Sequence, residues 1–236
     1  MDTDVLAAVR QELQQSIDEK TKESAQRFFK EEVKFHGVKS AAVKKIASKY
    51  FREIKGRDKK EIFSLCEDLL QAGFGEEAFI AFEWSYSLRR AYEPEDFGVF
   101  ESWVDRYVDN WAKCDTLCNH TLGTFVEMYP QFIDKLVAWA HAENRWLRRA
   151  SAVTLILPAR KGAFLKESFE IADILLQDRD DMVQKGYGWL LKEASKTHQA
   201  EVFDYVMRWK AKMPRTALRY AIEKMPAEKK KEAMAK

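Results

Sequence analysis

Hydrophobic residues recur along the chain with the period of an α-helix. Near the N-terminus Val5, Val9, Leu13 and Ile17 follow one another at intervals of four residues, which places them on one helix face. Similar patterns return in many successive segments that turn-forming residues separate, and no segment shows the strict alternation of a half-buried strand. The pattern therefore predicts an all-α chain of about fourteen helices.

The prolines indicate where several of these helices begin or end. Pro158 lies within an apolar run that begins near Arg145, and we expect it to end that helix because proline disrupts a helix interior. The other prolines suit the first turn of the helix that follows, where the missing N–H costs little. They are Pro94, Pro130, Pro214 and Pro226.

Short motifs recur at a nearly constant interval. The segment 110–113 aligns with 145–148 at an offset of 35 residues, and 147–150 aligns with 183–186 at an offset of 36. Such a period is typical of solenoids built from helix pairs of the HEAT type, whose stacked repeats form a concave binding face. We therefore predict one HEAT-like domain over residues 1–236, an α–α superhelix with about eight frayed residues at its end. A compact helical bundle is the competing architecture.

Charge is segregated along the chain although its net value is only +2. Residues 20–60 carry 14 Lys/Arg against 5 Asp/Glu, residues 61–140 carry 5 against 15, and residues 141–236 carry 20 against 13. Two basic blocks that flank an acidic one favour a polyanion-binding surface over an evenly solvated exterior.

Other features restrict the class of protein. The sequence lacks the roughly 20-residue apolar run of a membrane span and the core of a signal peptide. The odd set Cys66, Cys114 and Cys118 favours reduced thiols over a disulfide framework or a zinc site. We therefore expect a soluble, cytoplasmic monomer that binds no membrane, metal or cofactor.

The first candidate functional stretch runs from Asp109 to Asp115. Asp109 or Asn110 is expected to cap a new helix, since both side chains accept hydrogen bonds from backbone N–H groups. Trp111 and Asp115 lie four residues apart, so an aromatic ring and a carboxylate would project from the same helix face. The alternative is a core Trp beside an exposed Asp.

A second candidate stretch covers residues 181–196. One predicted helix face is apolar and comprises Val183, Tyr187, Leu190 and Ala194; the opposite face comprises Lys185, Trp189, Lys192 and Lys196. Gly186 and Gly188 would weaken this helix unless something must approach its backbone closely. A basic face that carries a Trp favours nucleic-acid contact. The alternative is that a neighbouring helix covers Trp189 and the lysines only surround it.

A third stretch begins at Asn144, a reasonable helix cap. Leu147, Ala150 and Thr154 define the inward side. Arg149 lies off that side, so its guanidinium could bind a phosphate or a carboxylate through two hydrogen bonds. A surface Arg is also common without any such role.

Together these stretches resemble the AlkD-type DNA alkylation repair glycosylases. The resemblance rests on Trp111-Ala112-Lys113-Cys114-Asp115, Trp146-Leu147-Arg148-Arg149-Ala150 and Gly188-Trp189-Leu190-Leu191-Lys192-Glu193, in that order and with similar spacing over nearly the whole chain. The segment Phe35-His36-Gly37-Val38 also resembles a phenylalanine-containing turn of that family.

The resemblance implies a HEAT-like superhelix that removes cationic N-alkylated purines, chiefly 3-methyladenine and 7-methylguanine, from double-stranded DNA in base excision repair. It implies catalysis without base flipping, metal or cofactor. The matching catalytic residues are Asp115, Trp111, Trp189 and Arg149, and the expected DNA-binding residues are Lys185, Lys192, Lys196, Arg148 and Gly188. Such an enzyme would be cytoplasmic and associate with the nucleoid when bound to DNA.

The chain departs from the family pattern at two places. Leu157-Pro158 stands where relatives can carry a DNA-contacting lysine, which Arg160 or Lys161 could replace, and Phe28 stands where a DNA-facing tyrosine can occur. Two other classes of function compete with the glycosylase. A non-catalytic HEAT-like adaptor would keep the scaffold without the chemistry, and an RNA-binding solenoid would share the basic face.

Overall fold

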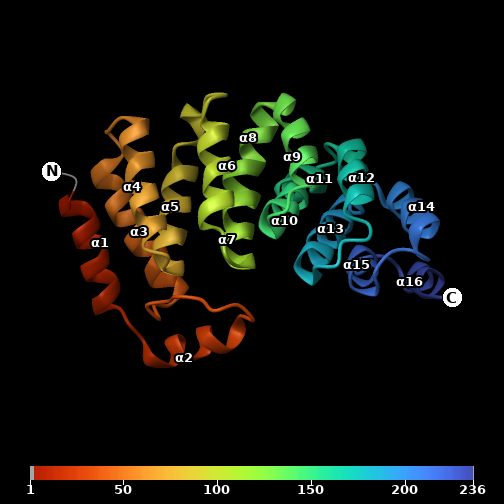
Figure 1. Cartoon of the computed structure of the whole chain (residues 1–236), viewed down its shortest axis with the longest axis horizontal. Helices are drawn as coiled ribbons and strands as arrows, with labels where there is room; N and C mark the ends of the chain where they lie inside the picture. Colours follow the sequence, from red (N-terminus) through yellow and green to blue (C-terminus); the bar gives the residue numbers. More distant parts are fainter. Residues whose placement is uncertain (1–2, 236) are drawn as a thin grey trace. The chain divides into compact units, whose positions relative to one another are not determined.

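The structure is a computed structural model that describes residues 3–235, with the side chains of residues 3, 4, 25 and 26 left undescribed. Over residues 3–235 the chain forms sixteen α-helices, two 3₁₀ turns and one π-helical turn (Figure 1). Pairing of extended segments in this range is limited to isolated bridges, such as that between Ile17 and Val38. The all-α prediction is confirmed.

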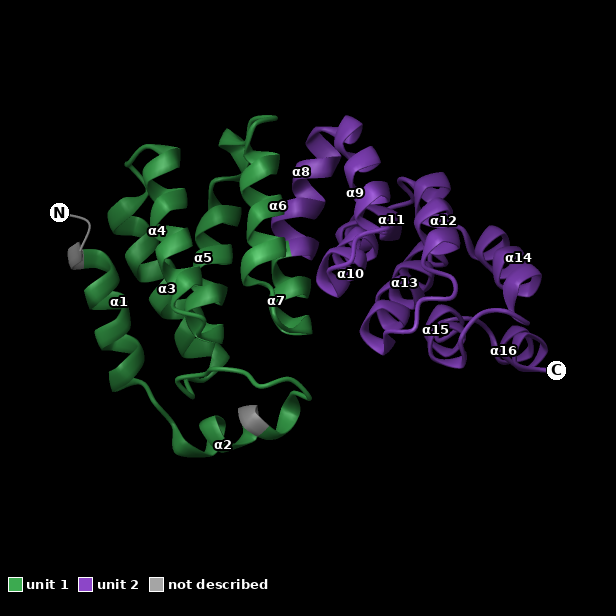
Figure 2. Ribbon diagram, viewed as in Figure 1, with its two compact units in different colours: residues 1–117 green, residues 118–236 purple. Residues whose placement is uncertain are grey.

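Two compact units make up the chain, residues 1–117 and residues 118–236 (Figure 2). The first unit contains α1 (Thr3–Gln15), α2 (Glu19–Phe28), α3 (Ser40–Ile54), α4 (Lys59–Gln71), α5 (Gly75–Ser87), α6 (Asp96–Tyr107) and α7 (Trp111–Thr116). Helix α5 lies at the centre of this unit because it packs against α3, α4 and α7. Its Trp84 is fully buried, and the indole Nε1 donates a 2.9 Å hydrogen bond to the carbonyl of Ala47 in α3.

The second unit is built around α13. It contains α8 (Gly123–Met128), α9 (Ile133–Trp139), α10 (Arg145–Thr154), α11 (Ile156–Arg160), α12 (Leu165–Ile174), α13 (Asp181–Ala194), α14 (Gln199–Trp209), α15 (Arg215–Ala221) and α16 (Ala227–Met234). Helices α10, α11, α12 and α15 all pack against α13. Most of the C-terminal segment that we expected to fray is helical, since α16 extends to Met234.

The prediction that Pro158 ends the helix starting near Arg145 is wrong in its position. Helix α10 ends at Thr154, and Pro158 lies inside the short helix α11. A proline ring clashes with the carbonyl four residues earlier, here that of Thr154, so the helix breaks before the proline. Within the first turn of α11 the missing N–H leaves no hydrogen bond unmade.

Close helix packing explains the glycines of α13. A Cβ atom at Gly188 would lie 2.7 Å from Tyr220 Cβ and 2.8 Å from the Ala217 carbonyl, both in α15. A Cβ atom at Gly186 would lie 3.3 Å from Arg149 Cγ in α10. The close approach expected at these glycines is therefore made by the chain's own helices.

A buried carboxylate holds the loop between α2 and α3 against the start of α5. Glu76 accepts hydrogen bonds from the backbone N–H groups of His36 (3.0 Å), Gly37 (2.9 Å) and Val38 (3.0 Å). The loop can follow this path because Gly37 adopts a φ of 93°, in the left-handed region that glycine tolerates. The ring of Phe35 packs directly over Gly75, where a Cβ atom would overlap with it.

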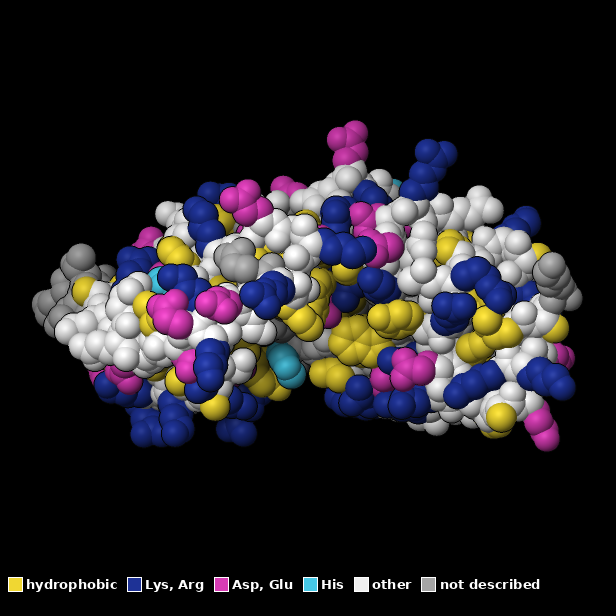
Figure 3. Space-filling model, turned by 90° about the horizontal axis from the view of Figure 1, so that it is seen from below, with side chains coloured by type: hydrophobic (Ala, Val, Ile, Leu, Met, Phe, Trp, Pro, Cys, Tyr) yellow, Lys and Arg dark blue, Asp and Glu magenta, His cyan; other side chains and the backbone are white. Residues whose placement is uncertain are grey.

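The surface carries charged groups of both signs. The face drawn in Figure 3 shows several separate groups of Lys and Arg side chains with Asp and Glu between them. Among the described residues the exposed large hydrophobic side chains are Phe28 (68% exposed) and Met128 (43%). No described helix has both the length and the apolar content needed to cross a membrane.

We predict that Gly188→Ala destabilises the second unit. The added methyl group would press on Tyr220 and on the Ala217 backbone, and overpacking of this kind costs about 1–3 kcal/mol. Gly98→Ala in α6 is the control, because nothing lies within 4 Å of its Cβ position, and there alanine should stabilise the helix by up to about 1 kcal/mol. Chemical denaturation of both variants tests this; equal effects would contradict the packing account.

We also predict that Glu76→Ala lowers the free energy of unfolding by about 3 kcal/mol, because three buried N–H groups lose their acceptor. The exposed Glu95 provides the control, and Glu95→Ala should change stability by less than about 0.5 kcal/mol. Amide hydrogen exchange at residues 36–38 should accelerate in the Glu76 variant alone. Unchanged exchange there would show that other contacts hold the loop.

Candidate functional site

The candidate stretch in the first unit begins with a well-formed helix cap. Asn110 Oδ1 accepts hydrogen bonds from the N–H groups of Ala112 (3.0 Å) and Lys113 (3.1 Å), so Asn110, and not Asp109, is the cap. Asp109 instead forms an ion pair of 2.7 Å with Lys113, whose Nζ also donates to the Gly73 carbonyl. These contacts fix the start of α7 and therefore the position of Trp111, its first residue.

Trp111 belongs to an aromatic cluster outside the buried core, in which Phe28 is exposed and the other rings are half-buried. It is half-buried, and its ring stacks on Phe29 with a centroid distance of 5.4 Å and an interplanar angle of 24°. Phe29 in turn stacks on Phe35 at 5.4 Å, and Phe28 lies 5.6 Å from Trp111 in a tilted orientation. The loop that Glu76 holds therefore supports one side of the indole.

Asp115 lies one helical turn after Trp111 and is also half-buried. The sequence predicted that these two residues share a helix face, and α7 contains both. The chain continues directly into the π-helical turn Leu117–Leu122, a geometry that is rare and often found near functional sites. Cys114 and Cys118, which flank Asp115 along the chain, are buried thiols.

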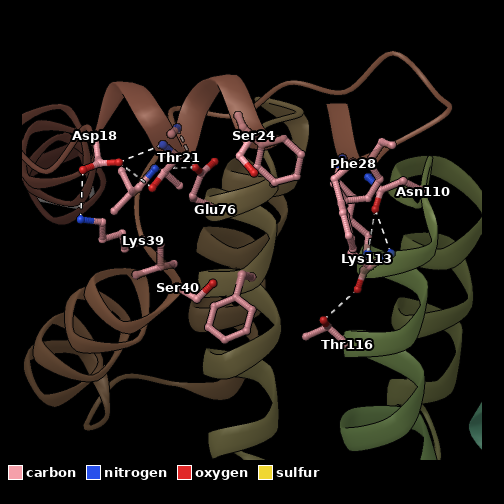
Figure 4. A pocket seen from close by; sticks show the side chains of 18 of the residues that line it. Asp18, Thr21, Ser24, Phe28, Lys39, Ser40, Glu76, Asn110, Lys113 and Thr116 are labelled. Atoms are coloured by element: carbon pink, nitrogen blue, oxygen red, sulfur yellow. Dashed lines mark hydrogen bonds and ion pairs between the residues drawn. The ribbon is translucent and has the colours of Figure 1, made fainter. Parts of the chain in front are cut away.

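A cavity of about 590 Å³ lies beneath α2 in the first unit. Figure 4 shows its lining side chains, which come from α2, the following loop, α3, α5 and α7. Five phenylalanines form much of the wall: Phe28, Phe29, Phe35, Phe79 and Phe82. Several polar groups at its edge bond to one another, as in the 3.0 Å ion pair between Lys39 and Asp18. Hydrogen bonds from Thr21 and Lys39 hold the pKa of Asp18 well below its usual range, at about 2.

The sequence indicated part of this aromatic environment. It singled out Phe28 and the turn at Phe35 by resemblance, but it gave no role to Phe29, which stacks between Phe35 and Trp111. The sequence feature that could have indicated a role for Phe29 is the adjacent pair Phe28-Phe29 at the end of a strongly polar segment. A phenylalanine pair at that place is difficult to bury on a helix otherwise rich in charged residues.

Arg149 is placed differently from the expectation. We predicted that Arg149 lies off the apolar side of its helix. Instead, Arg149 is only 4% exposed, and its side chain packs between α10 and α13. Its Nη1 donates a short hydrogen bond to the Met182 carbonyl. The absence of a side chain at Gly186 provides the space for this guanidinium.

Helix α13 presents its predicted mixed face, but the lysines on it have acidic partners. Lys185 pairs with Asp181 (3.1 Å), Lys192 with Glu223 (3.0 Å) and Lys196 with Glu193 (2.6 Å). Trp189 is half-buried between them along the helix, whereas Val183, Tyr187, Leu190 and Ala194 are buried as expected. The face therefore carries much less uncompensated positive charge than its lysines suggested.

Glu193 connects this face to α11. Its carboxylate pairs with Arg160 at 2.6 Å as well as with Lys196. Burial acts to raise the pKa of Glu193, but the hydrogen bonds from Lys196 and Arg160 outweigh it and leave the pKa below its ordinary value. Lys161 pairs with Glu127 at 2.8 Å, so both residues considered as replacements for the missing lysine have carboxylate partners.

Two further expected DNA contacts have structural roles. Arg148 pairs with Asp178 at 2.6 Å and donates to the carbonyls of Ala142 and Glu143. Gly188 is buried beneath α15, so it cannot admit DNA to the backbone, and we leave it out of the proposed DNA-binding surface. Both residues are occupied by contacts within the second unit: Arg148 bonds to Asp178 and to two backbone carbonyls, and Gly188 packs against α15.

The described residues contain no group of three or more His, Cys, Asp or Glu side chains arranged to hold a metal ion. Cys66 is buried like the other two cysteines, and burial raises the pKa of its thiol. Trp111 and Asp115 are in the first unit, and Arg149 and Trp189 are in the second. The first pair places a carboxylate and an indole four residues apart on one short helix, and both kinds of group can attract a cationic group.

Comparisons with known proteins show the fold and the family of this chain. A solved structure described as "Predicted DNA alkylation repair enzyme from Enterococcus faecalis" is similar with a TM-score of 0.81 and 16% sequence identity, over 90% of this chain and 98% of that one. At this identity the likeness establishes the fold alone. No curated protein matches the chain. The sequence profile of the DNA alkylation repair enzymes matches residues 9–225, and the chain therefore belongs to this family.

Proposed function

We propose that this protein is a monofunctional DNA glycosylase that releases purines alkylated at N3 or N7, such as 3-methyladenine and 7-methylguanine, from double-stranded DNA. The observation that carries the proposal is the pair Trp111 and Asp115, both half-buried on one capped helical turn. The family match supports DNA with alkylation damage as the substrate. The proposed architecture is a HEAT-type superhelix with a concave DNA-binding face.

The chemistry requires few groups. Alkylation at N3 or N7 gives the purine a positive charge, so it departs as a neutral base and needs no general acid, unlike the leaving group of most glycosides. The sugar develops oxocarbenium character as the bond breaks. A carboxylate such as Asp115 can stabilise this charge and position the water that attacks the sugar.

The aromatic residues would bind the cation. An indole face attracts a desolvated positive charge with up to about 2 kcal/mol. One side of Trp111 already stacks on Phe29, so the lesion would use what remains of its surface. We propose that Trp189 contributes a second indole and that Arg149, which donates a hydrogen bond to the Met182 carbonyl, is a positioning residue that acts through the start of α13.

The lysines of α13 would contact DNA only by exchanging partners. Lys196 has the most exposed side chain of the three (39%), and Lys192 the least (13%). A phosphate could replace Glu193 at Lys196 without moving the helix. Such contacts fix the position of the duplex and carry no sequence information.

An adaptor that binds DNA without chemistry would have no need for a carboxylate beside Trp111. We therefore predict that Asp115→Asn reduces the rate of 7-methylguanine release from methylated duplex DNA at least about 100-fold, because the amide cannot stabilise the developing charge. Chromatography of the released bases measures this rate. Binding to DNA that contains an abasic site should remain near the wild-type value.

Asp134→Asn serves as the matched control, since Asp134 is exposed on α9, and it should leave base release unchanged. An Asp115→Asn variant as active as this control would refute the role of Asp115. A wild-type protein that binds methylated DNA and releases no base would instead favour the adaptor.

A further inference from the structure

Helix α3 carries a stripe of positive charge on its outer face. Lys44, Lys45, Arg52 and Lys55 occur within twelve positions of α3 and its C-cap. At about 100° per residue they fall within an arc of roughly 100°. All four are exposed. We call these four residues the α3 stripe.

The apolar side of α3 lies opposite the stripe. Val43, Ile46, Ala47, Tyr50 and Ile54 are buried, and the helix packs against α1 and α5. The stripe is therefore fixed on a well-supported helix and faces away from the core. Ala41 and Ser48 lie between its charges on the exposed side, so no bulky side chain blocks access to them.

The charges of the stripe lack carboxylate partners among the described residues. This distinguishes them from Lys49 on the same helix, which pairs with Glu12 at 2.5 Å. The hydrogen bond with Glu12 raises the pKa of the Lys49 ammonium. The stripe also differs from the three lysines of α13, each of which has an acidic partner. The described acidic residue on the exposed half of α3, Glu53, lies to one side of the stripe.

The dimensions and composition of the stripe fit a phosphate backbone. From Lys44 to Lys55 the helix rises about 16 Å, and one DNA strand carries a phosphate about every 3.4 Å of rise. A membrane surface fits less well, because interfacial helices insert large apolar side chains. The exposed large hydrophobic residues in the described chain, Phe28 and Met128, lie outside α3.

We propose that the α3 stripe binds the phosphate backbone of duplex DNA, as an anchor separate from the pair Trp111 and Asp115. The choice of DNA as the polyanion rests on the proposed function. The stripe holds the duplex without reading its sequence, since phosphate contacts position a protein and do not specify bases. Release of counterions from the DNA makes this binding strongly dependent on salt.

The test compares two variants of equal charge. The stripe variant carries Lys44→Gln, Lys45→Gln, Arg52→Gln and Lys55→Gln. The control variant carries Arg90→Gln, Lys135→Gln, Lys166→Gln and Lys231→Gln, four exposed positions outside α3. Both should unfold at the wild-type temperature, because these side chains are on the surface. Binding to an undamaged DNA duplex is then measured by fluorescence anisotropy over a range of salt concentrations.

We expect the slope of log K against log salt to become shallower by about 3 to 4 in the stripe variant and to change little in the control. Equal slopes in the two variants would overturn the proposal. Tighter, stripe-dependent binding to an RNA duplex of the same sequence would also overturn it, as would stripe-dependent binding to vesicles that contain phosphatidylserine.

The result of this binding test can be told apart from the result of the base-release test of the proposed glycosylase. The measurement uses undamaged DNA and requires no base release, so a stripe effect can be found in a protein that lacks glycosylase activity. Conversely, a protein that releases 7-methylguanine and binds DNA with the same salt slope after loss of the stripe would retain the proposed function and lose this inference.

Discussion

The arrangement around Trp111 depends on one buried carboxylate. Glu76, at the start of the central helix α5, accepts three consecutive backbone N–H groups from the loop that follows α2. The neighbouring Glu77 adds a 3.1 Å contact to His36 and a 3.0 Å contact to Arg10 of α1. Through this loop Phe35 stacks on Phe29, and Phe29 stacks on Trp111. Without these anchors the stack of Phe35 and Phe29 beside the indole would lose its support.

Many of the basic side chains of this protein form ion pairs with its own carboxylates. Arg148, Arg160 and the lysines of α13 are engaged by nearby carboxylates, although their sequence pattern resembles a nucleic-acid surface. Ion pairs of this kind compensate buried or half-buried charge and limit what remains for a ligand. The α3 stripe differs because its helix offers no acidic neighbours at the same face. Counting basic residues along the sequence therefore does not distinguish the paired lysines of α13 from the exposed charges of α3.

In the second unit, two glycines of α13 allow neighbouring segments to approach its backbone closely. Gly186 makes room for the Arg149 guanidinium and Gly188 for α15. The side of α13 that contains these glycines is therefore a packing surface. Trp189 lies next to this packing surface and is half-buried. A half-buried side chain can pack against the protein on one side and contact a ligand on the other.

Local patterns along the chain were enough to predict the helical class, many of the buried faces and the shared turn of Trp111 and Asp115, and they narrowed the helix cap before Trp111 to Asp109 or Asn110. These features follow from local rules, since helical periodicity and capping involve residues only a few positions apart. The packed structure was needed to show that Arg149 is buried, that Gly188 meets α15 and that Phe29 stacks on Trp111. It also moved the helix break from Pro158 to Leu155. The first three depend on partners about 30 or more residues away, and the fourth depends on how a clash is relieved. Local spacing carries no information about either.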